Sequence, residues 1–228
     1  MLRDVVLVLL PFAFLHAQGN YEVQVYGSDL VPPRVTMVEL HSNFTARGVK
    51  TAIGGVLPTN HADGGWMWVG THLRPRMAVP ERYHLPVGLS LSTEFGYQRP
   101  NFSADTWTWE IRPIVDKKLG PWYLCFNPAL DKSFHGAGQS AGYEFSPNAK
   151  FSYDVTKRVA AGMEYYGGWG PLTGFDPLRD QIQQFLPAID VDFGPKWEFN
   201  FGVGWGVTSA TDRLLVKAIL GYRFNLRK

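Results

Sequence analysis

Apolar and polar residues alternate along most of this chain, and this pattern constrains the fold more than any other feature of the sequence. In residues 87–98, VGLSLSTEFGYQ, apolar, aromatic or threonine side chains occupy every second position. The same alternation recurs in residues 197–207 and 214–224. Successive side chains of a β-strand point to opposite sides of the sheet, so the pattern predicts strands with one apolar and one polar face. Helical periodicity is almost absent from residue 34 onward, which predicts an all-β fold.

Weaker copies of the alternation predict further strands near residues 35–44, 66–77, 106–117, 121–131, 144–154, 159–167 and 184–193. Together these segments make about ten strands, most of them roughly nine to eleven residues long, whereas strands of soluble sheets average about five or six. Nine to eleven residues is the length with which a tilted strand crosses a hydrocarbon layer. Longer loops are expected near residues 133–145 and 167–184, the second with a short helical turn over 177–185.

The polar face of these strands distinguishes a membrane barrel from a soluble one, because both kinds of barrel alternate with period two. That face combines Gly, Ser and Asn with charges of both signs, whereas a soluble exterior usually has more Lys and Thr and fewer Gly. Aromatic residues, among them Trp107, Trp122 and Trp197, lie near the ends of the strands, as in the two aromatic belts of a membrane barrel. On this interpretation arginine should be costly at outward-facing Leu91 and better tolerated at Ser92.

Composition excludes several other classes of protein. A mean hydropathy of −0.13 is too polar for a bundle of membrane-spanning helices. The net charge is +2 and only 18% of residues are charged, which argues against a nucleic-acid-binding protein. Cys125 is the single cysteine, so an intramolecular disulfide and a cysteine-based zinc site are both excluded.

The first residues, MLRDVVLVLLPFAFLHAQ, combine Arg3 with an apolar run from Val5 to Leu15. This run is too short to span a bilayer but suits a secretory signal peptide. We expect a signal peptide over residues 1–17 with cleavage after Ala17, an N-terminal periplasmic segment over 18–33 and the barrel over 34–228. The alternative for the first residues is a buried N-terminal strand or helix.

The signal segment, the alternating strands and a last strand, LLVKAILGYRF, that ends in an aromatic residue resemble the outer-membrane β-barrel proteins of double-membraned bacteria. The chain is also similar to a set of uncharacterised twelve-stranded outer-membrane proteins. The resemblance spans residues 34–224 and implies an antiparallel up-and-down transmembrane β-barrel of about 10–12 strands in the bacterial outer membrane. It also implies contact with outer-membrane lipid and recognition of the last strand by the barrel-assembly machinery.

Two features depart from this family. Four residues follow Phe224, which changes how the terminal aromatic residue is presented to the assembly machinery. Residues 45–65 contain one short apolar run and no second strand pattern. Because single-chain bacterial barrels have even strand numbers, a missing or truncated hairpin is expected there.

Charged side chains on the polar face are the best candidates for function, and two interpretations of them remain open. Opposite charges on neighbouring strands can pair and rigidify a small barrel, or they can line a path for polar solutes. The predicted function is a narrow channel or passive transporter for small polar solutes, and the alternative is a non-conducting structural or surface-interaction barrel. The candidate lumen-lining residues are Glu39, His41, His72, Arg74, Arg76, Glu94, Glu110, Arg112, Lys150, Asp190, Asp192, Glu198, Lys217 and Arg223.

Enzymatic and metal chemistry have weaker support in the sequence. Ser133 and His135 invite comparison with outer-membrane lipid hydrolases, but a serine nucleophile also needs a paired and oriented histidine. His41 and Ser42 are adjacent on a strand and point to opposite faces. His61, Asp63, His72 and the pair Asp190 and Asp192 lack the spacing of a metal site. We therefore expect no catalytic residue, no metal and no cofactor.

Overall fold

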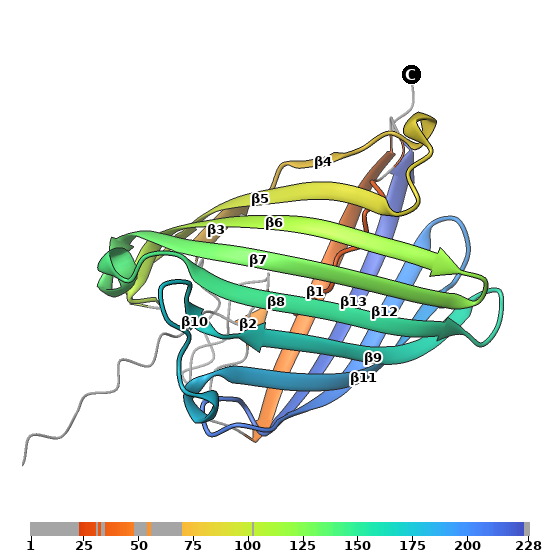
Figure 1. The fold of residues 1–228 in the computed structure, drawn as a ribbon. Coiled ribbons are helices and arrows are strands. Elements are labelled where there is room, and N and C mark those ends of the chain that lie inside the picture. Colours follow the sequence, from red (N-terminus) through yellow and green to blue (C-terminus); the bar gives the residue numbers. More distant parts are fainter. Residues whose placement is uncertain are drawn as a thin grey trace, which may run out of the picture.

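The computed structural model describes residues 23–30, 32, 35–47, 54–55, 70–101 and 103–225, and these residues form one curved antiparallel sheet (Figure 1). Nine of the described strands have ten or more residues. The strands are β1 (Val35–Arg47), β2 (Gly54–Gly55), β3 (Gly70–Leu73), β4 (Arg76–Ala78), β5 (Gly88–Gln98), β6 (Asp105–Leu119), β7 (Trp122–Gly136), β8 (Glu144–Asp154), β9 (Val159–Gly168), β10 (Gly170–Pro171), β11 (Ile182–Asp192), β12 (Trp197–Gly206) and β13 (Leu214–Asn225). Three short 3₁₀ turns complete the list: η1 (Glu81–Tyr83), η2 (Ala137–Ser140) and η3 (Leu178–Asp180).

Neighbouring strands follow one another in sequence, and the first long strand returns to the last. The order is β2-β1-β13-β12-β11-β9-β8-β7-β6-β5-β3, with β4 also paired to β5 and β10 to β8. All the pairings are antiparallel, and β1 pairs with β13 from Val35↔Asn225 to Arg47↔Leu214. The prediction of an all-β, antiparallel, up-and-down barrel is confirmed, and nine of the ten predicted strands each correspond to one strand of the structure. The segment predicted near residues 66–77 is described only from residue 70 and is divided into β3 and β4, with Arg74 and Pro75 between them. The short helical turn predicted over residues 177–185 is observed only over the three residues of η3, because β11 begins at Ile182.

The sheet has two edges within the described residues. One edge is β2, which has two residues and pairs with β1 at Ser42 and Asn43. The other edge is formed by β3 and β4, which pair with opposite halves of β5. No pairing between these edges is found in the described part of the chain. The segment in which we expect a truncated hairpin, residues 45–65, lies largely outside the described residues, which resume only at 54–55 and at 70.

The connections between strands differ in length at the two ends of the sheet. At one end three of them are short and span residues 120–121, 155–158 and 193–196, while the fourth, residues 79–87, is longer and contains η1; β1 begins and β13 finishes at this same end. At the other end they span residues 99–104, 137–143, 169–181 and 207–213. We name these the short-turn end and the long-loop end. In outer-membrane barrels the short turns face the periplasm and the longer loops face outward.

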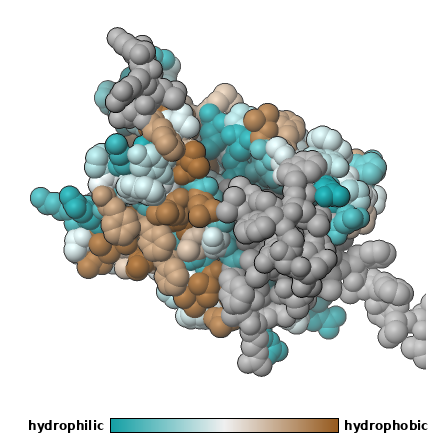
Figure 2. All heavy atoms as spheres, turned by 180° about the vertical axis from the view of Figure 1, so that it is seen from behind, coloured by the Kyte–Doolittle hydropathy of each residue, from teal (hydrophilic) through white to brown (hydrophobic). Residues whose placement is uncertain are grey.

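Polarity is inverted relative to a soluble protein. Ser92, Asn127 and Gln184 are completely buried on the concave face, while Phe95, Phe126 and Trp205 leave between 45% and 48% of their surface exposed on the outside. Figure 2 shows apolar side chains gathered in patches on the face that carries β1, β13 and β12. Soluble proteins bury such side chains, so the outside of this sheet is suited to lipid.

Aromatic side chains cluster at both ends of the strands. Near the short-turn end, Trp122 lies 4.7 Å from Tyr153 and Trp197 lies 4.5 Å from Tyr222, measured between ring centroids. Near the long-loop end, Tyr97 lies 4.8 Å from Trp107. These two belts agree with the prediction and match the aromatic girdles that flank the apolar band of membrane barrels.

Among the described residues, no helix has the length and apolar character that crossing a membrane requires.

Candidate functional site: the barrel lumen

Residues 23–30, which we name the lumenal segment, lie on the concave side of the sheet (Figure 1). Val23, Val25, Tyr26 and Ser28 each have less than 9% of their surface exposed. The sequence places these residues in a periplasmic segment over 18–33, whereas the structure places their described part inside the barrel. The difference arises from tertiary contacts, because residues 23–30 carry no regular secondary structure of their own.

The middle of the lumenal segment is held by hydrogen bonds from the inner face of β7. The amide of Asn127 accepts from the Tyr26 backbone N–H at 2.8 Å and donates to the Tyr26 carbonyl at 2.9 Å. The Cys125 thiol also donates to that carbonyl, at 3.0 Å. One side chain therefore satisfies both backbone groups of Tyr26, as a neighbouring strand would.

Closer to the short-turn end, Asp116 of β6 binds Ser28. Its carboxylate accepts from the Ser28 backbone N–H at 2.6 Å and from the Ser28 hydroxyl at 2.8 Å. Gly88 on β5 makes this approach possible, since a Cβ at that position would lie 2.1 Å from an Asp116 oxygen and 2.2 Å from the Ser28 hydroxyl.

Three arginines surround the Tyr26 ring. The guanidinium carbons of Arg74, Arg76 and Arg112 lie 4.8, 5.2 and 5.4 Å from its centroid, within the range of cation–π attraction. Arg74 also donates to the Tyr26 hydroxyl, and Arg76 donates to the Gly27 carbonyl at 2.5 Å. These contacts hold the lumenal segment against β4, β6 and the residue that follows β3.

A small apolar cluster closes the middle of the lumen. Val23, Val25 and Tyr26 of the lumenal segment pack there against inward-facing side chains of five strands: Ile114, Cys125, Tyr166, Leu186 and Leu215. A polar lumen thus contains a narrow apolar layer, made in part by residues that are not in the sheet.

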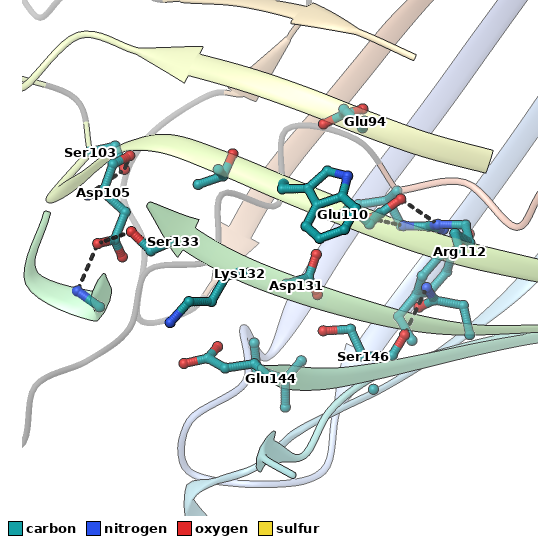
Figure 3. A pocket seen from close by; sticks show the side chains of 18 of the residues that line it. Glu94, Ser103, Asp105, Glu110, Arg112, Asp131, Lys132, Ser133, Glu144 and Ser146 are labelled. Carbon is teal, nitrogen blue, oxygen red and sulfur yellow. Dashed lines mark hydrogen bonds and ion pairs between the residues drawn. The ribbon is translucent and has the colours of Figure 1, made fainter. Parts of the chain in front are cut away.

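Ion pairs on β3 to β6 neutralise part of the charge near this layer. Glu94 binds both Arg74 and His72, the latter at 2.6 Å. Arg112 binds Glu110 with two nitrogens, Nε at 2.8 Å and Nη2 at 2.5 Å (Figure 3). The structure therefore brings together five of the predicted lumenal residues on one wall.

A second network crosses the opposite wall. Glu164 on β9 binds Lys217 on β13, which is 1% exposed, and accepts from the Tyr166 hydroxyl at 2.6 Å. Lys150 on β8 lies 3.3 Å from Glu164 and 2.6 Å from Asp190. The Glu164–Lys217 pair reaches over β11 and β12, which lie between β9 and β13 in the sheet.

The remaining predicted residues lie between the middle of the barrel and the short-turn end. Arg223 binds Glu198, and both are about one-third exposed. His41 is buried and its Nε2 lies 3.6 Å from Glu39. Asp192 accepts from the Gly194 backbone N–H at 2.7 Å in the turn after β11.

The lumenal segment divides two polar cavities. The outer cavity, toward the long-loop end, measures about 170 Å³ and is lined by Val23, Arg74, Glu110, Arg112 and Gln184 among others (Figure 3). The inner cavity, toward the short-turn end, measures about 290 Å³ and is lined by Val25, Glu39, Lys150, Asp190 and Lys217 among others. Gln24 lines both cavities. Both are larger than a water molecule requires.

Several residues that shape the lumen are missing from the predicted set. Asp131 and Gln184 occupy inward positions of the alternation, so the pattern could have found them. Asn127 and Asp116 also face inward, but their role depends on the lumenal segment, and nothing in the alternation shows that this segment enters the barrel.

The constellations considered for catalysis and metal binding do not assemble in the structure. The Ser133 hydroxyl donates to Asp105 at 2.9 Å, whereas His135 Nδ1 lies 2.7 Å from the Thr106 hydroxyl. Within the described residues, no group of three His, Cys, Asp or Glu side chains could hold a metal ion. His61 and Asp63 lie outside those residues.

No family model matches the chain, and no curated protein matches it. Three solved porin structures are similar in outline. The KdgM porin in complex with disordered oligogalacturonate is 8% identical, with a TM-score of 0.45, and the match covers 84% of this chain and 100% of that one. A second KdgM porin structure is 8% identical with a TM-score of 0.44 over 83% and 99% of the two chains, and the NanC porin is 11% identical with a TM-score of 0.41 over 82% and 98%.

Proposed function

We propose that this protein is an integral barrel of the bacterial outer membrane that acts as a narrow, passive channel for small polar solutes. The observation that carries the proposal is the inverted polarity of the barrel: exposed apolar side chains outside, flanked by two aromatic belts, and buried charged side chains inside. Such an exterior is costly in water and favourable in lipid. Assembly would proceed through β13, whose outward face ends in Tyr222 and Phe224.

The lumen supports a path for solutes on both sides of the lumenal segment. The two cavities approach each other at Gln24, and the apolar layer around Val23, Val25 and Tyr26 separates them. Passage through the barrel therefore requires the lumenal segment to move. If the signal peptide is cleaved after Ala17, Val23 is the sixth residue of the mature chain, so the segment can withdraw without breaking any strand pairing.

The second candidate function is a non-conducting structural barrel. It is favoured by the network of Glu164, Lys217 and Lys150, which spans the wall from β8 to β13. Buried ion pairs of this kind can fix the packing of a lumen. A lipid hydrolase is not favoured, because Ser133 and His135 bind different partners.

Single-channel recording on refolded protein in planar bilayers separates the first two candidates. The parent should show small or infrequent openings, and Asn127→Ala should open more often, because the buried Tyr26 backbone N–H loses the Asn127 oxygen that accepts from it, at a cost of about 1–3 kcal/mol. Asn148→Ala is the matched control: Asn148 lies directly opposite Asn127 on β8, and its side-chain amide donates to Ser146 instead of the lumenal segment.

Absence of conductance in the parent, in Asn127→Ala and in Asn148→Ala would contradict the proposed channel function and favour the structural barrel. If the parent conducts, Arg112→Ala should shift the ion preference toward cations and Glu110→Ala toward anions, because each removes one sign of charge from the outer cavity. Lower thermal stability without a change in selectivity would instead assign these two residues to a structural plug.

A further inference from the structure

An apolar hollow lies on the outer face of the barrel wall. It measures about 450 Å³ and is lined mainly from β6, β7, β8, β9 and β11, the strands that cross the front of the barrel in Figure 1. The large apolar side chains around it leave between 36% and 47% of their surface exposed: Val115, Leu124, Phe126, Phe151, Met163 and Phe185. A hollow with this lining takes a hydrocarbon chain more readily than a polar group.

The sheet register explains why the wall is hollow at this point. One row of outward-facing residues runs across five strands, and each residue pairs directly with the next: Val115, Phe126, Ala149, Tyr165 and Phe185. Ala149 is the one small side chain in this row. Because its methyl group fills far less space than the rings of Phe126 and Tyr165 on either side, it leaves a notch in the wall.

Lys117 lines the same hollow from the outer face of β6. It alternates with the buried, inward-facing Asp116, so its side chain points outward like that of Val115. In the described part of the chain, no carboxylate forms an ion pair with Lys117, whereas the neighbouring Lys118 binds Asp154. An unpaired ammonium group on a lipid-facing surface is costly, and an anion supplied by the membrane would remove that cost.

The other two charged residues that border the hollow direct their charges into the lumen. Asp116 binds Ser28 there, and Lys150 binds Asp190. Lys117 is therefore the cation that the outer face offers to a ligand in the hollow.

Lys117 lies one row inside the aromatic belt of the short-turn end. The next row toward that end contains Leu119, Trp122 and Tyr153 in register, and the last two belong to the belt. A lysine this close to a membrane interface extends its ammonium group toward the lipid headgroups while its stem stays against apolar surface. The charge of Lys117 thus reaches the level of lipid phosphates, and the notch at Ala149 lies at the level of acyl chains.

We propose that the hollow and Lys117 form a binding site for one anionic phospholipid. The lipid phosphate binds Lys117 Nζ, and one acyl chain lies in the notch at Ala149. With the short-turn end toward the periplasm, this lipid belongs to the inner leaflet of the outer membrane. The inference goes beyond the proposed function, because a lipid on the outer wall does not require the lumen to conduct.

Phosphatidylglycerol and phosphatidylethanolamine with the same acyl chains provide a matched pair of probes, since the first is anionic and the second zwitterionic. Native mass spectrometry on protein refolded in detergent micelles resolves each bound lipid. One copy of phosphatidylglycerol should bind about fivefold more tightly than phosphatidylethanolamine, because a lysine near an anionic headgroup contributes about that factor. Inorganic phosphate should not displace the lipid, since it has no acyl chain to fill the notch.

Variants of Lys117 test the headgroup contact. Lys117→Gln should lower the affinity for phosphatidylglycerol about fivefold, to the level of phosphatidylethanolamine, and Lys117→Arg should retain the preference because it keeps the charge. Lys157→Gln is the matched control: it removes the same charge from an exposed position in the turn 155–158, outside the hollow, and should leave the preference unchanged.

A variant of Ala149 tests the acyl-chain contact. Ala149→Leu should fill the notch and weaken binding of both lipids about fivefold, because the acyl chain loses apolar contact equivalent to about one methylene group. Ala218→Leu is the control, since Ala218 lies between the inward-facing Lys217 and Ile219 on β13 and therefore faces outward, away from the hollow. A band shift between unheated and boiled samples on SDS gels verifies folding of each variant.

Equal binding of the two lipids by the parent would overturn the proposal, as would displacement by inorganic phosphate. An equal loss of affinity in Lys117→Gln and Lys157→Gln would also overturn it, because attraction would then be spread over the whole short-turn end. Lipid binding and conductance are measured separately, so the two proposals fail independently. A barrel that binds the lipid without conducting would contradict only the channel, and a conducting barrel with no lipid preference would contradict only the lipid site.

Discussion

At the scale of the residue, neighbouring positions on one strand meet opposite environments. Leu91 lies on the outer face of β5 with 38% of its surface exposed, while Ser92 is completely buried inside. Alternation alone suggests that Ser92 would accept an arginine. The register changes that expectation, because Ser92 is flanked by Arg76 on β4 and Arg112 on β6, so a third arginine there would meet like charges in a closed space.

The lipid-facing assignment of Leu91 can be tested directly. Leu91→Arg should lower the free energy of unfolding by about 2–4 kcal/mol if Leu91 lies near the bilayer midplane. Leu91→Phe is the control, since it keeps the position apolar and should cost little. Reversible urea unfolding of the refolded protein in lipid vesicles gives both values. An arginine that costs no more than the phenylalanine would place this face of β5 in water.

At the scale of the element, the lumenal segment depends wholly on the strands around it. It has no regular backbone pairing, and its polar groups are met by Asn127, Asp116 and Arg76. Segments held by few contacts open more readily than strands of the sheet. The strands should therefore form without the lumenal segment, whereas the segment has no structure without the strands.

Cys125, the single cysteine, reports on the position of the lumenal segment. It is 5% exposed and its thiol donates to the Tyr26 carbonyl. Deletion of residues 23–29 should leave the heat-dependent band shift of the folded barrel intact and should speed labelling of Cys125 by a small water-soluble thiol reagent about tenfold or more. The urea-unfolded parent sets the maximum rate. Unchanged labelling of the deletion variant would show that other groups shield Cys125.

At the scale of the whole molecule, the arrangement of the connections defines an orientation. β1 begins and β13 finishes at the short-turn end, and the loops of 169–181 and 207–213 lie at the other end. In the proposed outer-membrane location, the short-turn end faces the periplasm and the long-loop end faces the outside. The outer cavity would then be the first part of the lumen that an external solute meets.

Epitope tags inserted at two glycines test this orientation. Gly174 lies in the loop 169–181 and Gly194 in the turn 193–196, and neither has an atom within 4 Å of the place a Cβ would occupy, so both sites should tolerate an insertion. Antibody should bind a tag after Gly174 on intact bacterial cells, and a tag after Gly194 only once the outer membrane is permeabilised. The reverse labelling pattern would show that the orientation is opposite to the proposed one. Recovery of the tagged protein in the soluble fraction would contradict its location in the membrane.

Alternation alone determined the strands, their two faces and the class of fold, because a strand's side chains point to opposite sides whatever its partners are. The inward positions of Glu164 and Lys217 follow from their places in this alternation. Tertiary structure decided which inward side chains meet: the pairing of Glu164 with Lys217 crosses two intervening strands, and the alignment of Glu94, Glu110, Asp131 and Glu144 depends on the register of four strands. It also decided the place of the lumenal segment, since residues without a repeating pattern are positioned only by contacts that distant strands provide.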